Sequence, residues 1–314
     1  MTLMTGHIGI VGAGLVGGGW TIVFARAGEQ VRVYDSSAAI RDEFMEIITG
    51  QLDDLKSFNL VDDVRAILAR ITVCENLGDA VDGARFIQES VFERTDVKTE
   101  ISNAIGPLLA DGAIVGSSTS GIPSSAFTES APNRERFLVT HPVNPPYLAP
   151  VVEVVPAPWT AQDAIDGALA LMAEVKQSPV LVRREVEGFI LNRLQGVLLR
   201  EAWDLFQEGY ASAEDIDKTV SEGLGLRWSF MGPFETIDMN APGGVADYAE
   251  RLGPLYHSIQ KSRTDPAPWS TDLISAVDKE RRAVLPSSKL AERRNWRDRR
   301  LMALAAHRAK QSSA

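Results

Sequence analysis

The chain of 314 residues lacks much of what several classes of protein require. Its single cysteine, Cys74, excludes an internal disulfide and is compatible with a reducing compartment. No apolar run reaches the roughly 18–20 residues that cross a bilayer, and the amino terminus lacks the basic start of a signal peptide. A net charge of −10, with no basic stretch interleaved with aromatics, argues against a nucleic-acid surface. These absences predict a cytoplasmic protein without membrane or nucleic-acid partners.

What the chain does contain is enough apolar sequence for two domains. A hydrophobic content of 45% over this length is sufficient for a full core. Strand-like segments alternate with helical ones as far as Arg184, which is typical of a doubly wound, mostly parallel sheet. From Val186 onward only helical patterns occur. We therefore predict an α/β fold: a Rossmann-like domain over residues 1–184, with a helical-hairpin insertion over 36–70, followed by an all-α domain over 185–314.

A glycine-rich turn follows the first predicted strand. The apolar run HIGIV leads into GAGLVG, and a second strand-like run, QVRVY, leads to Asp35. In such a turn Gly12 permits the tight bend, Gly14 lets the backbone approach a pyrophosphate, and Gly17 allows the helix to pack closely on the strand. The helix N-terminus attracts phosphate, and Asp35, about 20 residues further on, is suited to hydrogen-bond the ribose hydroxyls. This combination predicts a dinucleotide site.

The residues around Asp35 also predict which nicotinamide cofactor binds. A carboxylate at this position repels a 2′-phosphate, and Ser36 and Ser37 follow it where an NADP enzyme would place an arginine. Arg41 is several residues too distant along the chain to be a confident phosphate partner. NAD is favoured over NADP.

A second region, residues 117–153, carries a candidate acid–base pair. His141 is one of only four histidines and ends an apolar run, beside prolines and an asparagine where a strand should stop and a loop begin. Glu153 is a lone carboxylate inside the next apolar run. A histidine exchanges a proton near neutral pH, and a buried carboxylate can orient it and stabilise its cation. The alternative is a hydrogen-bonded loop histidine without a catalytic role.

Several motifs are spread over essentially the whole chain: GAGLVG, QESVFER, SSTSG, HPVNPPY, VVEVVP, GFILNRLQ, EGLGLRWSFMGPFET and LAERRNWRDRRLMALA. Together they resemble the 3-hydroxyacyl-CoA dehydrogenase superfamily, and within it the lambda-crystallin branch, which is similar to L-gulonate 3-dehydrogenase. The resemblance implies a Rossmann domain followed by a helical domain that dimerises, and NAD-dependent oxidation of an L-3-hydroxy group to a 3-keto group.

Roles for individual residues follow from that resemblance. His141 would be the general base, and Glu153 would orient it. Ser120 and Asn192 would hydrogen-bond the reacting oxygen or its neighbours, although Ser120 could simply start a turn and Asn192 could be polar packing on a helix. No metal is expected. The expected cofactor-binding residues are Gly12, Gly14, Leu15, Val16, Gly17, Asp35, Glu93, Lys98 and Ser118.

The substrate is predicted from three departures from the acyl-CoA enzymes. The hairpin over residues 36–70, which in those enzymes is lysine-rich and meets the CoA nucleotide, here carries seven acidic residues against four basic ones, a poor surface for a tri-phosphorylated ligand. Arg227, beside Trp228, could hold a carboxylate bidentately. The alternative is an ordinary interdomain or intersubunit salt bridge, for instance with Glu222 or Glu235. Ser118 and Pro142-Val143 also stand where the acyl-CoA enzymes usually have asparagine and aromatic residues.

The resulting prediction is an NAD-dependent dehydrogenase, a homodimer, that oxidises the L-3-hydroxy group of a small free hydroxy acid, of the L-gulonate 3-dehydrogenase type. The alternatives are a short-chain L-3-hydroxyacyl-CoA dehydrogenase, which would take an acyl-CoA substrate, and an L-carnitine dehydrogenase. A crystallin-like structural or NAD-sensing protein would require loss of a catalytic residue. The four expected catalytic residues, His141, Glu153, Ser120 and Asn192, are all present.

Overall fold

The chain folds into two compact units. The structure is a computed structural model that describes residues 6–263 and 267–311. The first unit extends to Gln195 and resumes at Asn295, and the second comprises Gly196–Arg294. The first unit holds the sheet and the second is helical, as the sequence pattern predicts.

An eight-stranded sheet organises the first unit, with strand order β3-β2-β1-β4-β5-β6-β7-β8. All neighbouring strands pair in parallel except β6 and β7, which are antiparallel. The prediction of a mostly parallel, doubly wound sheet is confirmed. The strands are β1 (His7–Val11), β2 (Val31–Tyr34), β3 (Ile71–Cys74), β4 (Ala84–Glu89), β5 (Ile114–Ser117), β6 (Phe137–Pro142), β7 (Val151–Pro156) and β8 (Ser178–Leu181).

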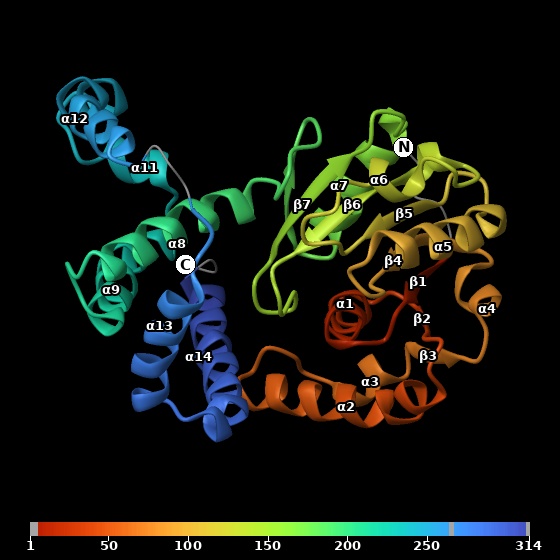
Figure 1. Cartoon of the computed structure of the whole chain (residues 1–314). Coiled ribbons are helices and arrows are strands. Elements are labelled where there is room, and N and C mark those ends of the chain that lie inside the picture. Colours follow the sequence, from red (N-terminus) through yellow and green to blue (C-terminus); the bar gives the residue numbers. More distant parts are fainter. Residues whose placement is uncertain (1–5, 264–266, 312–314) are drawn as a thin grey trace. The chain divides into compact units, whose positions relative to one another are not determined.

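Helices cover both faces of this sheet, which explains why its strands are apolar on both sides (Figure 1). One core includes side chains of α1, α2 and α7, and the other includes side chains of α4 and α5. The sequence analysis did not predict α4, because five residues are too few to show a helical period. The helices are α1 (Leu15–Arg26), α2 (Ala38–Ser57), α3 (Val64–Leu68), α4 (Leu77–Val81), α5 (Thr95–Ile105), α6 (Ser125–Thr128) and α7 (Gln162–Glu174), with short 3-10 turns η1 (Gly106–Leu108) and η2 (Arg134–Arg136).

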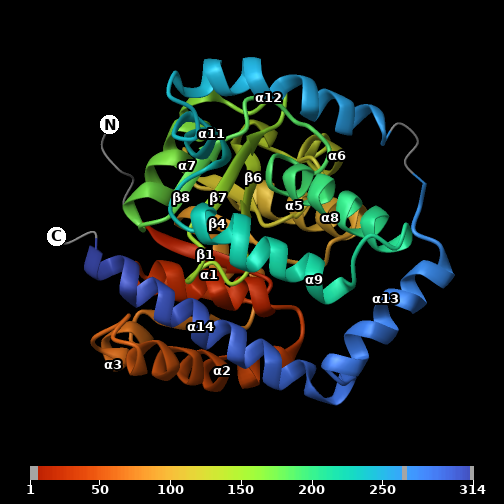
Figure 2. The ribbon, with the colours of Figure 1, turned by 90° about the vertical axis from the view of Figure 1, so that its left-hand side faces the viewer.

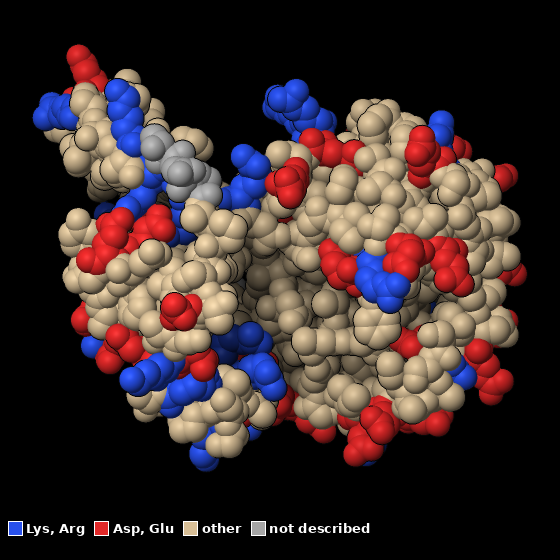
Figure 3. All heavy atoms as spheres, in the orientation of Figure 1, with Lys and Arg blue, Asp and Glu red and all other residues tan. Residues whose placement is uncertain are grey.

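The insertion after β2 is a helical hairpin, as predicted. Ser37 caps α2 and Asp63 caps α3, and the chain reverses through Asn59, which takes a left-handed conformation (φ 58°). The carboxyl-terminal helix α14 (Leu290–Gln311) returns to this region and lies beside α2 (Figure 2). Its Met302 joins the core that α2 lines, and its Arg299 lies 3.7 Å from Asp54. Acidic side chains gather along the hairpin edge of the first unit (Figure 3).

The second unit consists of helices with little buried apolar surface. Among its described residues, Leu273 is the only buried apolar side chain. No strand occurs from Val186 onward in the described part of the chain. No helix in the described ranges is long and apolar enough to span a bilayer. Its elements are most of α8 (Leu191–Gln207), then α9 (Ala213–Lys218), the π-helix η3 (Thr219–Leu224), α10 (Gly225–Trp228), α11 (Pro233–Asp238), α12 (Gly244–Lys261), α13 (Thr271–Val284) and η4 (Ser287–Lys289).

Candidate active site

The glycine turn between β1 and α1 has the geometry of a phosphate cradle. Gly12 has a positive φ of 99°, and a Cβ there would lie 2.5 Å from the carbonyl oxygen of Ser90. A Cβ on Gly17 would lie 1.8 Å from the carbonyl oxygen of Gly12, so the close helix–strand contact requires glycine. Nothing lies within 4 Å of the Cβ position of Gly14, so the backbone there is open to a ligand. The backbone conformation at Gly12 and the close contact at Gly17 therefore require glycine, as the motif predicts.

The start of α1 offers uncompensated backbone donors to that ligand. No side chain caps the helix, and its first turn, which includes the exposed Leu15 and the half-buried Val16, carries no acidic residue. Asp35 at the end of β2 accepts hydrogen bonds from the N–H groups of Ala13 (2.8 Å) and Ser37 (2.9 Å), which ties the turn to the second strand. Positive helix-end charge beside a carboxylate fits the phosphates and the ribose of a dinucleotide.

His141 and Glu153 face each other across β6 and β7. They are register partners in the antiparallel pair, and His141 Nδ1 lies 2.8 Å from Glu153 Oε2. Both side chains are buried, with 6% and 2% of their surface exposed. The sequence analysis expected the strand to stop at His141, but β6 continues to Pro142 because β7 supplies pairing partners up to that residue.

The other carboxylate oxygen of Glu153 holds the start of α8. Oε1 accepts the backbone N–H groups of Ile190 (2.7 Å) and Leu191 (3.0 Å). Burial raises the pKa of Glu153, but the hydrogen bonds from His141 and from the Leu191 and Ile190 amides outweigh it and hold the pKa below its usual value. The carboxylate is therefore ionised at neutral pH, His141 Nδ1 donates to it, and Nε2 is left as the basic nitrogen.

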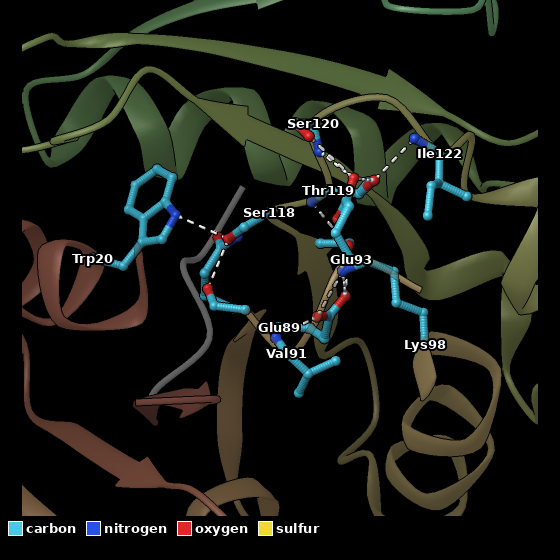
Figure 4. A network of polar contacts seen from close by, with 12 residues as sticks. Trp20, Glu89, Val91, Glu93, Lys98, Ser118, Thr119, Ser120 and Ile122 are labelled. Carbon is cyan, nitrogen blue, oxygen red and sulfur yellow. Dashed lines mark hydrogen bonds and ion pairs between the residues drawn. The ribbon is translucent and has the colours of Figure 1, made fainter. Parts of the chain in front are cut away.

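Ser120 and Asn192 belong to a polar cluster on the loop after β5. The Ser120 backbone N–H and hydroxyl both donate to Glu93 Oε1 (2.8 and 3.1 Å), which also accepts from Thr119 Oγ1 (2.7 Å), as Figure 4 shows. The amide of Asn192 donates to the carbonyl oxygen of Ser120. Because the Ser120 proton is directed at Glu93, its hydroxyl presents an acceptor to any incoming group.

Lys98 is buried and engages two carboxylates. Its Nζ lies 3.0 and 3.1 Å from the two oxygens of Glu89 and 3.5 Å from Glu93 Oε2 (Figure 4). Glu89 also accepts from Ser117 Oγ (2.5 Å) and from the N–H of Val91 (2.7 Å). The sequence analysis missed Glu89, although a carboxylate ending an apolar strand was a visible signal.

Ser118, an expected cofactor residue, forms three side-chain hydrogen bonds, with Trp20, Gln88 and Ser90. Arg227 lies in the second unit, on α10 (Gly225–Trp228), where it is exposed. Among the described residues of this chain, Arg227 forms no salt bridge with Glu222 or Glu235.

Comparison with family models identifies both parts of the chain. Residues 7–186 match the NAD-binding domain of 3-hydroxyacyl-CoA dehydrogenase, and residues 188–284 match the C-terminal domain of the same family. The chain is 38% identical over 306 residues to the lambda-crystallin homolog of Rattus norvegicus, covering 96% of this chain and 95% of the relative. These matches confirm the resemblance and the prediction of NAD as cofactor.

Two further proteins are similar over most of their length. An L-carnitine dehydrogenase of Streptomyces coelicolor is 35% identical, covering 87% of this chain and 83% of the relative. The solved structure of 5-formyl-3-hydroxy-2-methylpyridine 4-carboxylic acid 5-dehydrogenase, an NAD+-dependent dismutase, aligns with a TM-score of 0.81 at 27% identity, covering 97% of this chain and 98% of that one.

Proposed function

The chain belongs to the 3-hydroxyacyl-CoA dehydrogenase family, and we propose that it oxidises the L-3-hydroxy group of a small free hydroxy acid, of the L-gulonate 3-dehydrogenase type. It is an NAD-dependent dehydrogenase of hydroxy acids or their acyl-CoA esters. The observation that carries the proposal is the buried pair of His141 and Glu153, in which the imidazole is oriented and Nε2 is left basic.

In the proposed reaction, His141 Nε2 takes the proton of the substrate hydroxyl while the carbon–oxygen bond becomes a carbonyl. NAD, when bound, supplies the acceptor for the hydride that leaves carbon 3. Glu153 stabilises the imidazolium that forms, and its own attachment to the Ile190 and Leu191 amides keeps it in place. The Asn192 amide donates a hydrogen bond to the reacting oxygen, and the Ser120 hydroxyl accepts one from a neighbouring group of the substrate. The turn from Gly12 to Gly17, with Asp35, holds the dinucleotide.

The charge of α2 and α3 supports a free acid over a CoA ester. Of the four basic residues in the hairpin, Arg41 and Arg70 already donate to the backbone carbonyls of Asp35 and Ala25. With Lys56 and Arg65 these cations face seven carboxylates, so the hairpin carries a net negative charge that repels a ligand with three phosphates. The similar pyridine carboxylic acid dehydrogenase and L-carnitine dehydrogenase are themselves named for free acids.

We assign the substrate carboxylate to Arg227. Its guanidinium is exposed and has no salt-bridge partner within the described residues, and a fork of N–H donors matches a carboxylate bidentately. Arg227→Met should raise KM for the free acid at least tenfold while the Kd of NADH stays unchanged. Unchanged kinetics would refute this assignment.

The substrate class is tested by NAD reduction with L-gulonate, L-3-hydroxybutyrate, L-carnitine and L-3-hydroxybutyryl-CoA at one enzyme concentration. A free acid should give the highest kcat/KM. If the CoA ester exceeds every free acid, the chain is a short-chain acyl-CoA dehydrogenase, and if L-carnitine leads, it is a carnitine dehydrogenase.

We also propose that the helical domain, residues 185–314, forms a homodimer. Large apolar side chains are exposed in this domain, among them Leu226, Phe230 and Phe234, and exposed apolar surface of this kind is typical of a protein interface. The sedimentation mass should be twice that of the chain, and Phe234→Glu should lower it toward the monomer. A wild-type monomer at micromolar concentration would refute the dimer.

We place the enzyme in the cytoplasm. Support comes from its single cysteine, Cys74, which is free and buried, as suits a reducing compartment. Microscopy of a carboxyl-terminal fluorescent fusion tests this, and a signal confined to any other compartment would refute it.

A further inference from the structure

A chain of hydrogen-bonded side chains runs through the first unit and ends at Ser90. It begins at Thr140 on β6, whose hydroxyl donates to Gln88 Oε1 on β4 (2.9 Å), both side chains being fully buried. Gln88 Nε2 donates in turn to Ser118 Oγ (2.8 Å), which lies 2.7 Å from Ser90 Oγ. Ser118 was expected from the sequence as a cofactor-binding residue, whereas neither Gln88 nor Ser90 was singled out.

Counting donors and acceptors gives this chain a direction. Ser118 Oγ also accepts the indole N–H of Trp20 (3.1 Å), which Figure 4 shows pointing at it from α1. A hydroxyl oxygen accepts two hydrogen bonds and donates one. Because Gln88 and Trp20 fill both acceptor positions, the Ser118 hydrogen goes to Ser90 Oγ. The hydrogen of Ser90 then has no acceptor among the hydrogen bonds of the described residues.

Ser90 lies at the edge of the sheet where a dinucleotide is expected to bind. It directly follows β4; its N–H donates to the carbonyl oxygen of Val11 (2.7 Å), and its own carbonyl oxygen packs against Gly12. β1 has β2 on one side and β4 on the other, so the strand order reverses between β1 and β4. Ligands of open α/β sheets bind outside the carboxyl ends of the strands at that point. Asp35, directly after β2, marks the adenosine side of β1, and Ser90, directly after β4, lies on the other side of β1.

We propose that Ser90 Oγ donates its hydrogen to an oxygen in the nicotinamide half of bound NAD. That half offers phosphate, ribose and carboxamide oxygens, all of which accept hydrogen bonds. Ser90 is then a cofactor-binding residue, and Ser118, held by Trp20 and Gln88, is a positioning residue that directs the donation outward. The inference concerns the cofactor alone and does not depend on which hydroxy acid is oxidised.

The test is equilibrium binding of NADH and of AMP to Ser90→Ala by titration calorimetry. AMP contains only the adenosine half, so its Kd should stay at the wild-type value, whereas the Kd of NADH should rise about five- to tenfold, the loss of one neutral hydrogen bond. The thermal unfolding temperature should fall only slightly, because Ser90→Ala removes one acceptor, that of the Ser118 hydroxyl hydrogen. Ser130→Ala, at an exposed serine bonded to Asn103, is the matched control and should change neither Kd.

Ser118→Ala should lower the unfolding temperature more than Ser90→Ala does. It removes the acceptor of the Trp20 indole and of the Gln88 amide, so the unfolding temperature should fall. An unchanged Kd of NADH in Ser90→Ala, or an equal loss of AMP affinity, would overturn the proposal. So would Ser118→Ala that weakens NADH binding without lowering the unfolding temperature, since the free donor would then be Ser118. If Ser90→Ala itself proves unstable, Ser90→Cys, with a similar shape and a weaker donor, is compared in the same way.

Discussion

Two buried carboxylates in the first unit have similar surroundings but pair with different side chains, and we expect them to have different roles. Glu89 ends β4 and Glu153 lies within β7; each is 2% exposed and accepts backbone N–H groups. Glu89 pairs with Lys98, whereas Glu153 pairs with His141. A lysine ordinarily keeps its proton at neutral pH, whereas a histidine exchanges its proton there. The partner of each carboxylate therefore distinguishes a fixed ion pair from a proton acceptor. Four experiments test this difference.

The largest effect is expected at His141. His141→Gln removes the base but keeps a polar side chain of similar size, so kcat should fall about 10²–10⁴-fold. The Kd of NADH, measured by calorimetry, should remain at the wild-type value. His257→Gln, the same change at an exposed histidine of α12, is the control and should be silent. Normal turnover of His141→Gln would place the base elsewhere.

Lys98→Met should act on stability. It leaves the Glu89 carboxylate buried without its cation, and breaking such a pair costs about 3–5 kcal/mol, measured by urea unfolding. Combining Lys98→Met with Glu89→Gln should restore most of that loss, because no unpaired charge remains. If the double variant is as unstable as the sum of the two single ones, Glu89 and Lys98 are not coupled as the geometry indicates.

Glu153→Gln should separate the two roles of this side chain, which are to orient His141 and to hold the start of α8. The amide oxygen can still accept from Ile190 and Leu191, so the start of α8 stays in place. The amide N–H faces His141 Nδ1, which must then accept, and the proton moves to Nε2, where the base is needed. We expect kcat to fall about 10²–10³-fold with little change in stability. Glu153→Ala should also destabilise the fold, by about 1 kcal/mol, because the helix loses its cap.

The smallest effect is the response of stability to acid. The pKa of Glu153 lies below its usual value, because hydrogen bonds from His141 and two backbone amides outweigh burial, which raises it. A group of this kind stabilises the fold above its unfolded pKa, and that stability is lost as pH falls through the lower folded value. In urea midpoints between pH 6 and pH 3, Glu153→Gln should therefore lose less stability than wild type. Parallel curves would show that Glu153 contributes nothing to the pH dependence.

Local patterns made much of the fold predictable. The turn from Gly12 to Gly17 is dictated by backbone geometry, since a Cβ at either end would collide with neighbouring backbone. The hairpin of α2 and α3 was predicted from a helical pattern over residues 36–70, and the structure shows that Ser37 and Asp63 cap its two helices. α4 and the continuation of β6 through His141 were missed, because the first is too short and the second depends on pairing with β7.

The sequence by itself determined the family, the NAD cofactor and the alternation of strands and helices, because these depend on residue types at fixed spacings. Only the tertiary structure decided which groups meet. It placed Glu153 opposite His141 and at the start of α8, paired Glu89 with Lys98, and directed the Ser118 hydrogen toward Ser90. The physical reason is that a hydrogen bond is specified by distance and direction between atoms. Those are set by strand order and register, which join residues far apart in the chain.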